Sequence, residues 1–190
     1  MHMNQILRKV RDCTACAQHC PLGCKPLVQI GPRARILIIG QAPGQKAHTS
    51  GIPWNDASGN RLRDWLGMSS KNFYDPDRVA LMPMGFCFPG TGASGDLPPR
   101  PECAPLWHEK LLRVMPNIAL TVLIGKYALD RYAPELPGDT MTTRIAGFRA
   151  LLPNRFPLVH PSPRNGIWLR KNPWFMTDLI PELRKRVLTV

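Results

Sequence analysis

The sequence predicts an α/β fold with a mainly parallel β-sheet. Short apolar, β-branched segments of strand length alternate along the chain with longer segments whose apolar residues recur at helical spacing, and this alternation is typical of βαβ units. Loops rich in Gly and Pro separate the two kinds of segment. With 190 residues, the chain is long enough to bury a core. We therefore expect a single domain over residues 1–190 that begins with a cysteine-rich arm at residues 1–30.

Four segments have the pattern of buried strands. Gly40 closes the first of them, and His160 follows the last. Because ligands bind at the carboxyl ends of the strands in an open parallel sheet, we expect the residues after these two strands to share one site. The predicted strands are residues 35–39, 79–84, 119–124 and 156–159.

Helices are predicted where apolar residues recur every three or four positions. Leu62, Trp65 and Leu66, for example, fall on one face of a helix. The segment at 148–152 is ambiguous between helix and strand. The predicted helices cover residues 4–12, 60–66, 102–114, 126–133 and 173–187.

The charge balance indicates a polyanionic partner. The chain carries 25 Lys and Arg residues against 13 Asp and Glu residues, a formal net charge of +12, and nucleic acid is the first candidate partner. Solubility alone is the alternative explanation. The longest clean apolar run is Ile36–Ile39, far short of the roughly 20 residues of a membrane-spanning helix. We therefore expect a cytoplasmic, nucleoid-associated monomer that binds DNA and no membrane.

Three motifs in chain order resemble those of the uracil-DNA glycosylase superfamily. They are Gly-Gln-Ala-Pro-Gly at 40–44, Gly-Ile-Pro-Trp-Asn-Asp-Ala-Ser-Gly at 51–59 and His-Pro-Ser-Pro at 160–163. The resemblance spans nearly the whole chain and implies a three-layer α/β/α sandwich around a four-stranded sheet. It also implies a monofunctional DNA glycosylase of base excision repair. Such an enzyme flips a deaminated base, most simply uracil, out of DNA and hydrolyses its N-glycosidic bond.

The resemblance assigns roles to the motif residues. His160 matches the histidine that hydrogen-bonds the leaving base, and Trp54 matches the aromatic residue that stacks on it. Gln41 and Ala42 would contribute backbone donors or position water, and Asp56 would serve the sugar side of the bond. Each has a structural alternative: Trp54 as a core aromatic, His160 as a turn cap and Asp56 as a helix cap.

The chain also departs from the family pattern. Ala42 stands where the main uracil-DNA glycosylases have a water-orienting Asp, and Gln41 stands where the iron–sulfur members have an acid. Pro83 stands where the family has an Asn that pairs with the uracil edge. We therefore expect backbone groups of residues 82–85 to read the base, and the preferred base could be another deaminated or damaged one.

The loop after the last motif is the predicted DNA contact. In the family this loop enters the minor groove and fills the gap left by the flipped base. A solvated basic loop is the alternative. The residues predicted to contact substrate or phosphate here are Ser162, Arg164, Asn165, Ile167, Arg170 and Lys171.

The cysteines resemble the ligands of the iron–sulfur uracil-DNA glycosylases. Cys13, Cys16, Cys87 and Cys103 match the four thiolates that hold a [4Fe-4S] cluster there. Four Cys ligands equally suit tetrahedral zinc, and unliganded thiols are a third possibility. Cys20 and Cys24 are additional and could substitute as ligands or pack as small apolar side chains. The metal would staple the N-terminal arm to the 87–103 loop.

Two other functions fit part of the sequence. A nucleic-acid-binding protein with a glycosylase fold and no catalysis would explain Gln41, Ala42 and Pro83. A small metal-dependent redox or regulatory protein would explain the cysteines but leaves the two strand-end motifs without a role.

Overall fold

A computed structural model describes residues 2–93 and 95–190, and within them a parallel four-stranded sheet with strand order β2-β1-β5-β6 forms the centre of the protein. The register pairs Ile38 of β1 with Leu81 of β2 and Val122 of β5, and Val122 with Phe156 of β6. The expected parallel sheet is confirmed. Its strands are β1 (Ile36–Ile39), β2 (Val79–Leu81), β5 (Leu120–Ile124) and β6 (Arg155–Leu158).

Strand β2 is shorter than the sequence pattern predicted. It ends at Leu81, and the backbone N–H groups of Met82 and Met84 donate to the carbonyls of Ile38 and Gly40. Pro83 lies between them, at a position that faces away from β1, so its missing N–H interrupts no bond to β1. Regular strand geometry thus ends at Leu81, but residues 82–84 stay bonded beside the first motif.

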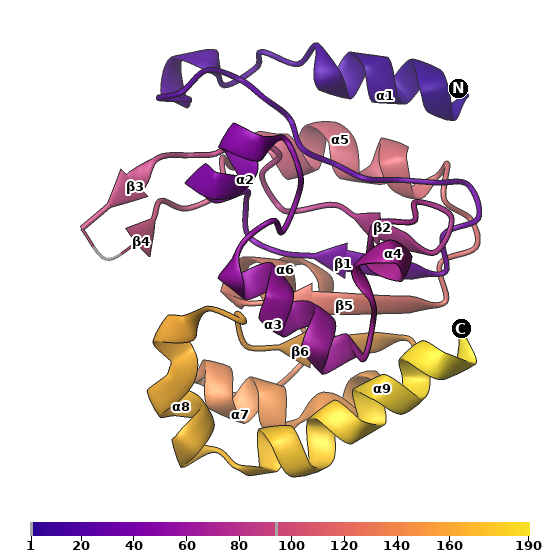
Figure 1. The fold of residues 1–190 in the computed structure, drawn as a ribbon, viewed down its shortest axis with the longest axis vertical. Coiled ribbons are helices and arrows are strands. Elements are labelled where there is room, and N and C mark those ends of the chain that lie inside the picture. The colour runs from indigo at the N-terminus through magenta and orange to yellow at the C-terminus, as the bar shows by residue number, and fades with distance from the viewer. Residues whose placement is uncertain (1, 94) are drawn as a thin grey trace.

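Helices cover both faces of the sheet, as expected for a three-layer sandwich. In Figure 1, α3 lies in front of the sheet and α6 lies behind it. The ambiguous segment at 148–152 is a 3-10 turn at Phe148–Leu151, and the predicted helix at 173–187 is divided into a π turn at Phe175–Leu179 and α9. The helices are α1 (Met3–Arg11), α2 (Gln45–Ser50), α3 (Ala57–Leu66), α4 (Ser70–Phe73), α5 (Cys103–Leu112), α6 (Lys126–Tyr132), α7 (Met141–Ala146), α8 (Gly166–Lys171) and α9 (Ile180–Thr189).

The core forms where the strands meet these helices. Strand β1 is buried at every position, as expected for a central strand of a parallel sheet. Helix α3 buries Leu62, Trp65 and Leu66, the face predicted from their spacing. Trp65 packs edge-on against Phe175 with 4.9 Å between ring centroids, which ties α3 to the C-terminal helices.

The N-terminal arm lies on the β2 side of the sheet, with α1 next to α5 (Figure 1). Helix α1 buries Ile6 and Val10 and packs against α5. The chain rejoins the body at residues 27–29, where Leu27 N–H donates to the Phe86 carbonyl and Gln29 bridges Leu81 in antiparallel fashion. The arm is thus fixed at both of its ends, with the cysteines between them.

A short hairpin, β3 (Thr91–Gly92) and β4 (Gly95–Asp96), extends from the side of the protein toward which the sheet strands point (Figure 1). The sequence predicted only a Gly- and Pro-rich loop here, because two-residue strands carry no alternating pattern. Among the described helices, none is long and apolar enough to cross a membrane.

Candidate functional site

A cavity of about 480 Å³ opens at the carboxyl ends of β1 and β6. The structure brings to it the residues that the sequence predicts for catalysis and base binding, whereas the predicted DNA contacts Ile167, Arg170 and Lys171 lie outside its lining. Its lining includes Gln41, Ala42, Trp54, Asp56, Pro83, His160, Ser162, Arg164 and Asn165. Their convergence follows from the parallel order of the strands, because motifs after neighbouring β1, β5 and β6 meet at one edge. Their individual roles stay predictions.

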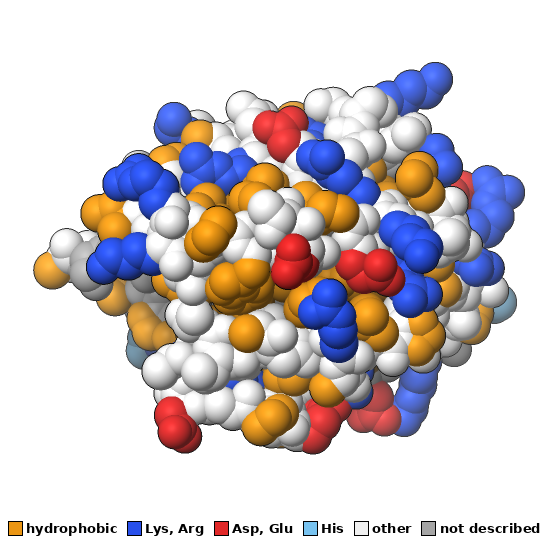
Figure 2. Space-filling view, turned by 90° about the horizontal axis from the view of Figure 1, so that it is seen from below, with side chains coloured by type: hydrophobic (Ala, Val, Ile, Leu, Met, Phe, Trp, Pro, Cys, Tyr) orange, Lys and Arg blue, Asp and Glu red, His pale blue; other side chains and the backbone are white. Residues whose placement is uncertain are grey.

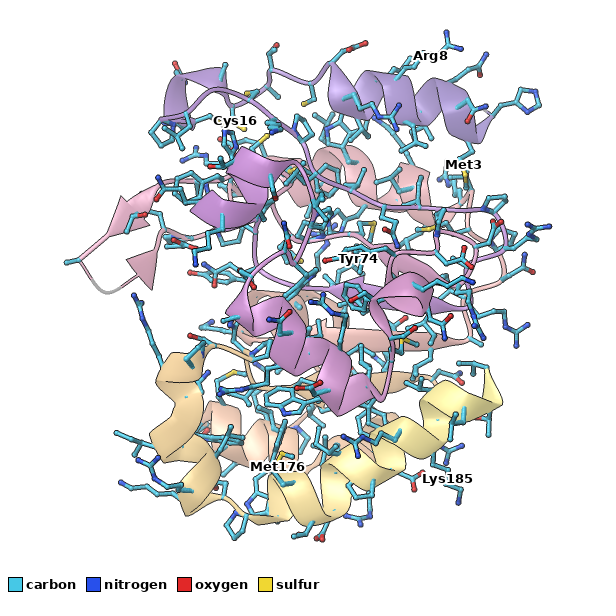
Figure 3. The ribbon with its side chains drawn as sticks, in the orientation of Figure 1. Met3, Arg8, Cys16, Tyr74, Met176 and Lys185 are labelled. Atoms are coloured by element: carbon cyan, nitrogen blue, oxygen red, sulfur yellow. The ribbon has the colours of Figure 1, made fainter. Side chains whose placement is uncertain are left out.

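Trp54 is held in the cavity wall by a strained backbone and two glycines. Its φ of 58° lies in the left-handed region that a bulky residue rarely adopts. A Cβ at Gly59 would lie 1.7 Å from the Trp54 carbonyl oxygen, and one at Gly40 would lie 2.8 Å from its ring. Tyr74, labelled in Figure 3, donates to the carbonyl of Pro53 at 3.0 Å. These contacts fix the backbone and ring of Trp54, and the residue is only half-buried.

His160 has one ring nitrogen occupied and one available. Its Nδ1 accepts a hydrogen bond from Ser162 N–H at 3.2 Å, so in the neutral ring the proton is on Nε2. Burial lowers the His160 pKa, and the Asp56 carboxylate partly opposes this. The ring lies against Trp54, with 5.8 Å between centroids and an interplanar angle of 27°. His160 therefore both caps its turn and offers a neutral N–H donor.

Asp56 also combines a structural and a cavity-facing position. It is the N-cap of α3, and its Oδ1 accepts from Gly59 N–H at 2.8 Å. The residue lines the cavity as well, and a Cβ at Gly44 would lie 4.0 Å from Asp56 Oδ2. The helix cap expected as the alternative is present, and it aims the second oxygen toward the first motif.

Gln41 faces the hairpin. Its Nε2 donates to the carbonyl of Leu97 at 3.0 Å, so the side-chain amide connects the first motif to the segment that follows β4. The next residue, Ala42, lines the cavity. Within the described part of the chain, no protein group accepts from the Ala42 N–H, so this donor can serve a ligand.

The segment expected to read the base edge is largely occupied. The N–H groups of Met82, Met84 and Gly85 donate to carbonyls of β1 and the first motif. The Pro83 carbonyl accepts from Nε2 of His108 at 3.0 Å. Pro83 thus lines the cavity with its carbonyl already bonded to His108, and the backbone donors expected at residues 82–85 are already paired.

His108 was not predicted from the sequence. It is buried on α5, and its Nδ1 lies 2.6 Å from the Tyr132 hydroxyl. Burial lowers its pKa to about 4, so the ring is neutral at physiological pH. With Nε2 donating to Pro83, the histidine supports the cavity wall from behind. A lone His within an amphipathic helix gives no sequence signal for this role.

The loop after His160 is anchored at several points. Arg61 of α3 donates to the Ser162 carbonyl at 2.9 Å, and Asn165 Nδ2 donates to the His160 carbonyl at 2.7 Å. Asn165 therefore fixes the loop, whereas Ile167 is 61% exposed. Arg164 lines the cavity. On the face viewed in Figure 2, Lys and Arg side chains are dispersed among acidic and apolar ones.

Asp96 is a second carboxylate at the cavity that the sequence did not single out. It lies on β4 and lines the cavity opposite the first motif. Burial of the carboxylate raises its pKa, Arg164 opposes the shift and Asp56 adds to it. A single acid in a Gly-rich loop has no pattern around it, so its position could be found only from the fold.

The cysteines form one group at the base of the N-terminal arm. Cys13, Cys16, Cys87 and Cys103 all line a small cavity of about 10 Å³, which brings together the four ligands implied by the resemblance. Figure 3 shows Cys16 on the arm. Cys20 Sγ lies 3.8 Å from Cys16 Sγ and 3.6 Å from Cys24 Sγ.

These thiols have the surroundings of metal ligands. Trp107 Nε1 and Phe86 N–H donate to the sulfurs of Cys13 and Cys103, each at 3.3 Å. Burial raises the pKa of Cys87 and of Cys103 to about 12, so a bound cation is needed to hold them as thiolates at neutral pH. Cys16, Cys20 and Cys24 lie close enough together to bind a metal ion. The donor set fits a thiolate-bound metal. The cavity of about 10 Å³ is smaller than an iron–sulfur cluster, so the four thiols that line it would have to move apart to bind one.

Two comparisons relate the chain and its fold to known proteins. The family model of the uracil DNA glycosylase superfamily matches residues 28–184, which include both strand-end motifs and exclude the four N-terminal cysteines. The solution NMR structure of a candidate uracil DNA glycosylase from Methanosarcina acetivorans superposes with a TM-score of 0.50 at 16% identity, covering 84% of this chain and 94% of that chain. At this identity, the structural match supports the α/β fold.

Proposed function

The chain belongs to the uracil DNA glycosylase superfamily, and from this premise we propose that it is a monofunctional DNA glycosylase of base excision repair. Its substrate would be DNA with a deaminated base, most simply uracil. The observation that carries the proposal is His160, whose Nδ1 is fixed by Ser162 N–H so that Nε2–H is presented as a donor at the cavity.

The base would bind between the two strand-end motifs. Trp54 would stack on its face, an interaction worth roughly 1–3 kcal/mol per base. Cleavage of the N-glycosidic bond leaves negative charge on the base. A neutral donor aimed at a base oxygen stabilises that charge as it develops, and His160 Nε2–H and the Ala42 N–H are suited to this.

The sugar side of the bond would be served by Asp56. Its Oδ1 is held by the α3 cap, which leaves Oδ2 to stabilise positive charge on the sugar or to orient water. The acids that other members carry in the first motif are absent at Gln41 and Ala42. A carboxylate from a neighbouring element would therefore replace them.

The flipped nucleotide would be replaced in the stack by the loop after His160. Ile167 is 61% exposed in the first turn of α8, directly after the segment that Arg61 and Asn165 anchor, so it is placed to fill the gap. Arg170 and Lys171, in the last turn of α8, would contact phosphates.

A [4Fe-4S] cluster on Cys13, Cys16, Cys87 and Cys103 would join the arm to the 87–103 loop. Their common cavity supports this set, and the cluster would supply structural cross-linking. A single tetrahedral ion is the second candidate. A zinc–sulfur bond of about 2.3 Å puts sulfurs about 3.8 Å apart, close to the Cys16–Cys20 and Cys20–Cys24 separations of 3.8 and 3.6 Å.

A base-release assay tests the proposed function. The purified protein is incubated with single- and double-stranded oligonucleotides that hold one uracil, hypoxanthine or xanthine, and abasic sites are then cleaved with alkali. We expect cleavage at one of these bases, with a loss of about 10²- to 10³-fold in rate for His160→Ala and none for His2→Ala. Tight, salt-dependent binding without cleavage would instead support a binding protein on the same fold.

A further inference from the structure

The β3–β4 hairpin carries a carboxylate to the same point as Asp56. A Cβ at Gly44 would lie 3.2 Å from Asp96 Oδ2 and 4.0 Å from Asp56 Oδ2. The two acids come from different elements, β4 and the N-terminus of α3, and both line the cavity. Gly44 ends the first motif, so the two carboxylates converge where the motif lacks its own acid.

Asp96 differs from Asp56 in how its oxygens are used. One oxygen of Asp56 is occupied by the helix cap at 2.8 Å. Within the described part of the chain, no protein donor is hydrogen-bonded to the Asp96 carboxylate. Arg164 lies close enough to influence it, and a Cβ at Gly95 would lie 2.5 Å from Arg164 Nη1. Both Asp96 oxygens are thus available for water at the mouth of the cavity.

The hairpin is held in register with the first motif. Gln41 Nε2 donates to the Leu97 carbonyl at 3.0 Å, and Leu97 N–H donates to the Gly90 carbonyl at 2.9 Å. The amide at Gln41 therefore fixes the residue next to Asp96. An acid in place of Gln41 would set a carboxylate against a carbonyl oxygen and near Asp96, which explains why an amide suits this position.

We propose that Asp96 is a catalytic carboxylate that orients the attacking water and accepts its proton, and that Gln41 is the positioning residue that holds the hairpin for this step. The inference rests on the proposed glycosylase function and adds a residue to it. Asp56 then remains the carboxylate fixed on the sugar side.

The step balances without a further reactant. The bond from C1′ to the base nitrogen breaks, and its electron pair leaves on the base, where His160 Nε2–H stabilises it. A water oxygen forms the new bond to C1′, and one water proton passes to the Asp96 carboxylate. That proton then goes to solvent or to the released base, which leaves an abasic sugar, the free base and ionised Asp96.

Single-turnover base release tests Asp96. Asp96→Asn is expected to slow release by about 10²- to 10⁴-fold, with DNA affinity and unfolding temperature near those of the wild type. Asp139→Asn changes an acid that is exposed like Asp96 but lies outside the cavity, makes the same change in charge and is expected to leave the rate unchanged. If Asp96 merely repels phosphate, Asp96→Asn would tighten binding and keep the rate, and the inference would be overturned.

The positioning role of Gln41 is tested by measuring Gln41 variants with and without Asp96→Asn. Gln41→Glu and Gln41→Ala are each expected to lower the single-turnover rate about 10-fold or more at unchanged DNA affinity. In the Asp96→Asn background, Gln41→Ala should have no further effect, because it acts through that carboxylate. A full additional loss there, or a faster Gln41→Glu enzyme, would contradict the positioning role.

The two levels of the proposal can fail separately. A wild type that releases no base from any oligonucleotide overturns the glycosylase function, and Asp96 falls with it. An active wild type whose Asp96→Asn variant stays within threefold overturns the role of Asp96 alone.

Discussion

The cavity at the strand ends and the cysteine group at the arm differ in how their polar atoms are held. In the cavity, His160 and Asp56 each have one polar atom bonded to the protein's own backbone and another left for a ligand. In the cysteine group, buried thiols contact one another, and burial raises the pKa of Cys87 and Cys103 to about 12. The polar atoms of the first site are held by the protein's own backbone, whereas the thiols of the second would become thiolates only with a bound cation. Variants in the two regions should therefore fail in different ways.

The largest expected effect is on the cysteine group. Structural metal sites of this kind contribute on the order of 10 kcal/mol in small domains. Cys87→Ser or Cys103→Ser should therefore remove the metal and lower the unfolding temperature by about 10 °C or more. Metal and sulfide analysis with thermal unfolding measures both quantities.

Cys20→Ser and Cys24→Ser are the matched variants. If a cluster occupies the four cavity-lining cysteines, these two keep their iron and sulfide. Loss of zinc from Cys20→Ser, with no iron in the wild type, would instead assign a single ion to Cys16, Cys20 and Cys24.

The next largest effect is the pH dependence of folding stability that comes from His108, the buried histidine behind the cavity wall. The His108 pKa is about 4 in the folded protein, below its ordinary value of about 6.5. Its contribution to folding is therefore complete above pH 6.5 and is lost as pH falls toward 4, by about 3 kcal/mol. His160, whose pKa burial also lowers, acts in the same direction.

Denaturant unfolding at pH 7.5 and pH 4.5 measures this loss of folding stability. His108→Gln keeps hydrogen-bonding capacity without titrating in this range, so its stability should fall less on acidification than that of the wild type. Equal losses in the two proteins would show that His108 is not the source.

Trp54 should matter for activity more than for folding. Trp54→Ala removes the stacking face and should slow base release by about 10- to 100-fold, in line with roughly 1–3 kcal/mol per stacked base. Trp54→Phe keeps an aromatic face and should lose less. If Trp54→Ala releases base as fast as the wild type, Trp54 is only a structural residue of the cavity wall.

The smallest expected effect is at the proposed DNA contact in the first turn of α8. Ile167→Ala should weaken binding to DNA that holds the target base by about two- to tenfold, because the gap in the stack is filled less well. Leu188→Ala, an equally apolar truncation at a residue 85% exposed on α9, is the control. Titration of labelled duplexes measures both, and equal affinities would remove Ile167 from the interface.

The strand-end residues could be predicted because motif and topology agree. Parallel strands must bring the residues after β1 and β6 to one edge, so His160 and Gln41 follow from the sequence. For Asp56 and His160, the sequence offered a structural or a functional role. The structure shows that one residue fills the structural role with one atom and faces the cavity with another.

Other parts of the site have no local signal. The backbone of Trp54 is left-handed because Gly59 approaches it closely, a contact between residues that only the folded loop brings together. Asp96 lies on strands too short to show a period. The role of His108 depends on Pro83 and Tyr132, which are distant in sequence. Contacts of this kind come from packing, and no pattern in the chain encodes them locally.

The activity that we propose for the cavity is the release of a base from DNA. The most direct measurement is mass spectrometry of the products after a single turnover with duplexes that hold uracil or another deaminated base. We expect one free base for each abasic strand formed, an uncut sugar–phosphate backbone, and formation of both products slowed about 10²- to 10³-fold in His160→Ala. Tight binding of the same duplexes with no free base at any lesion would contradict it.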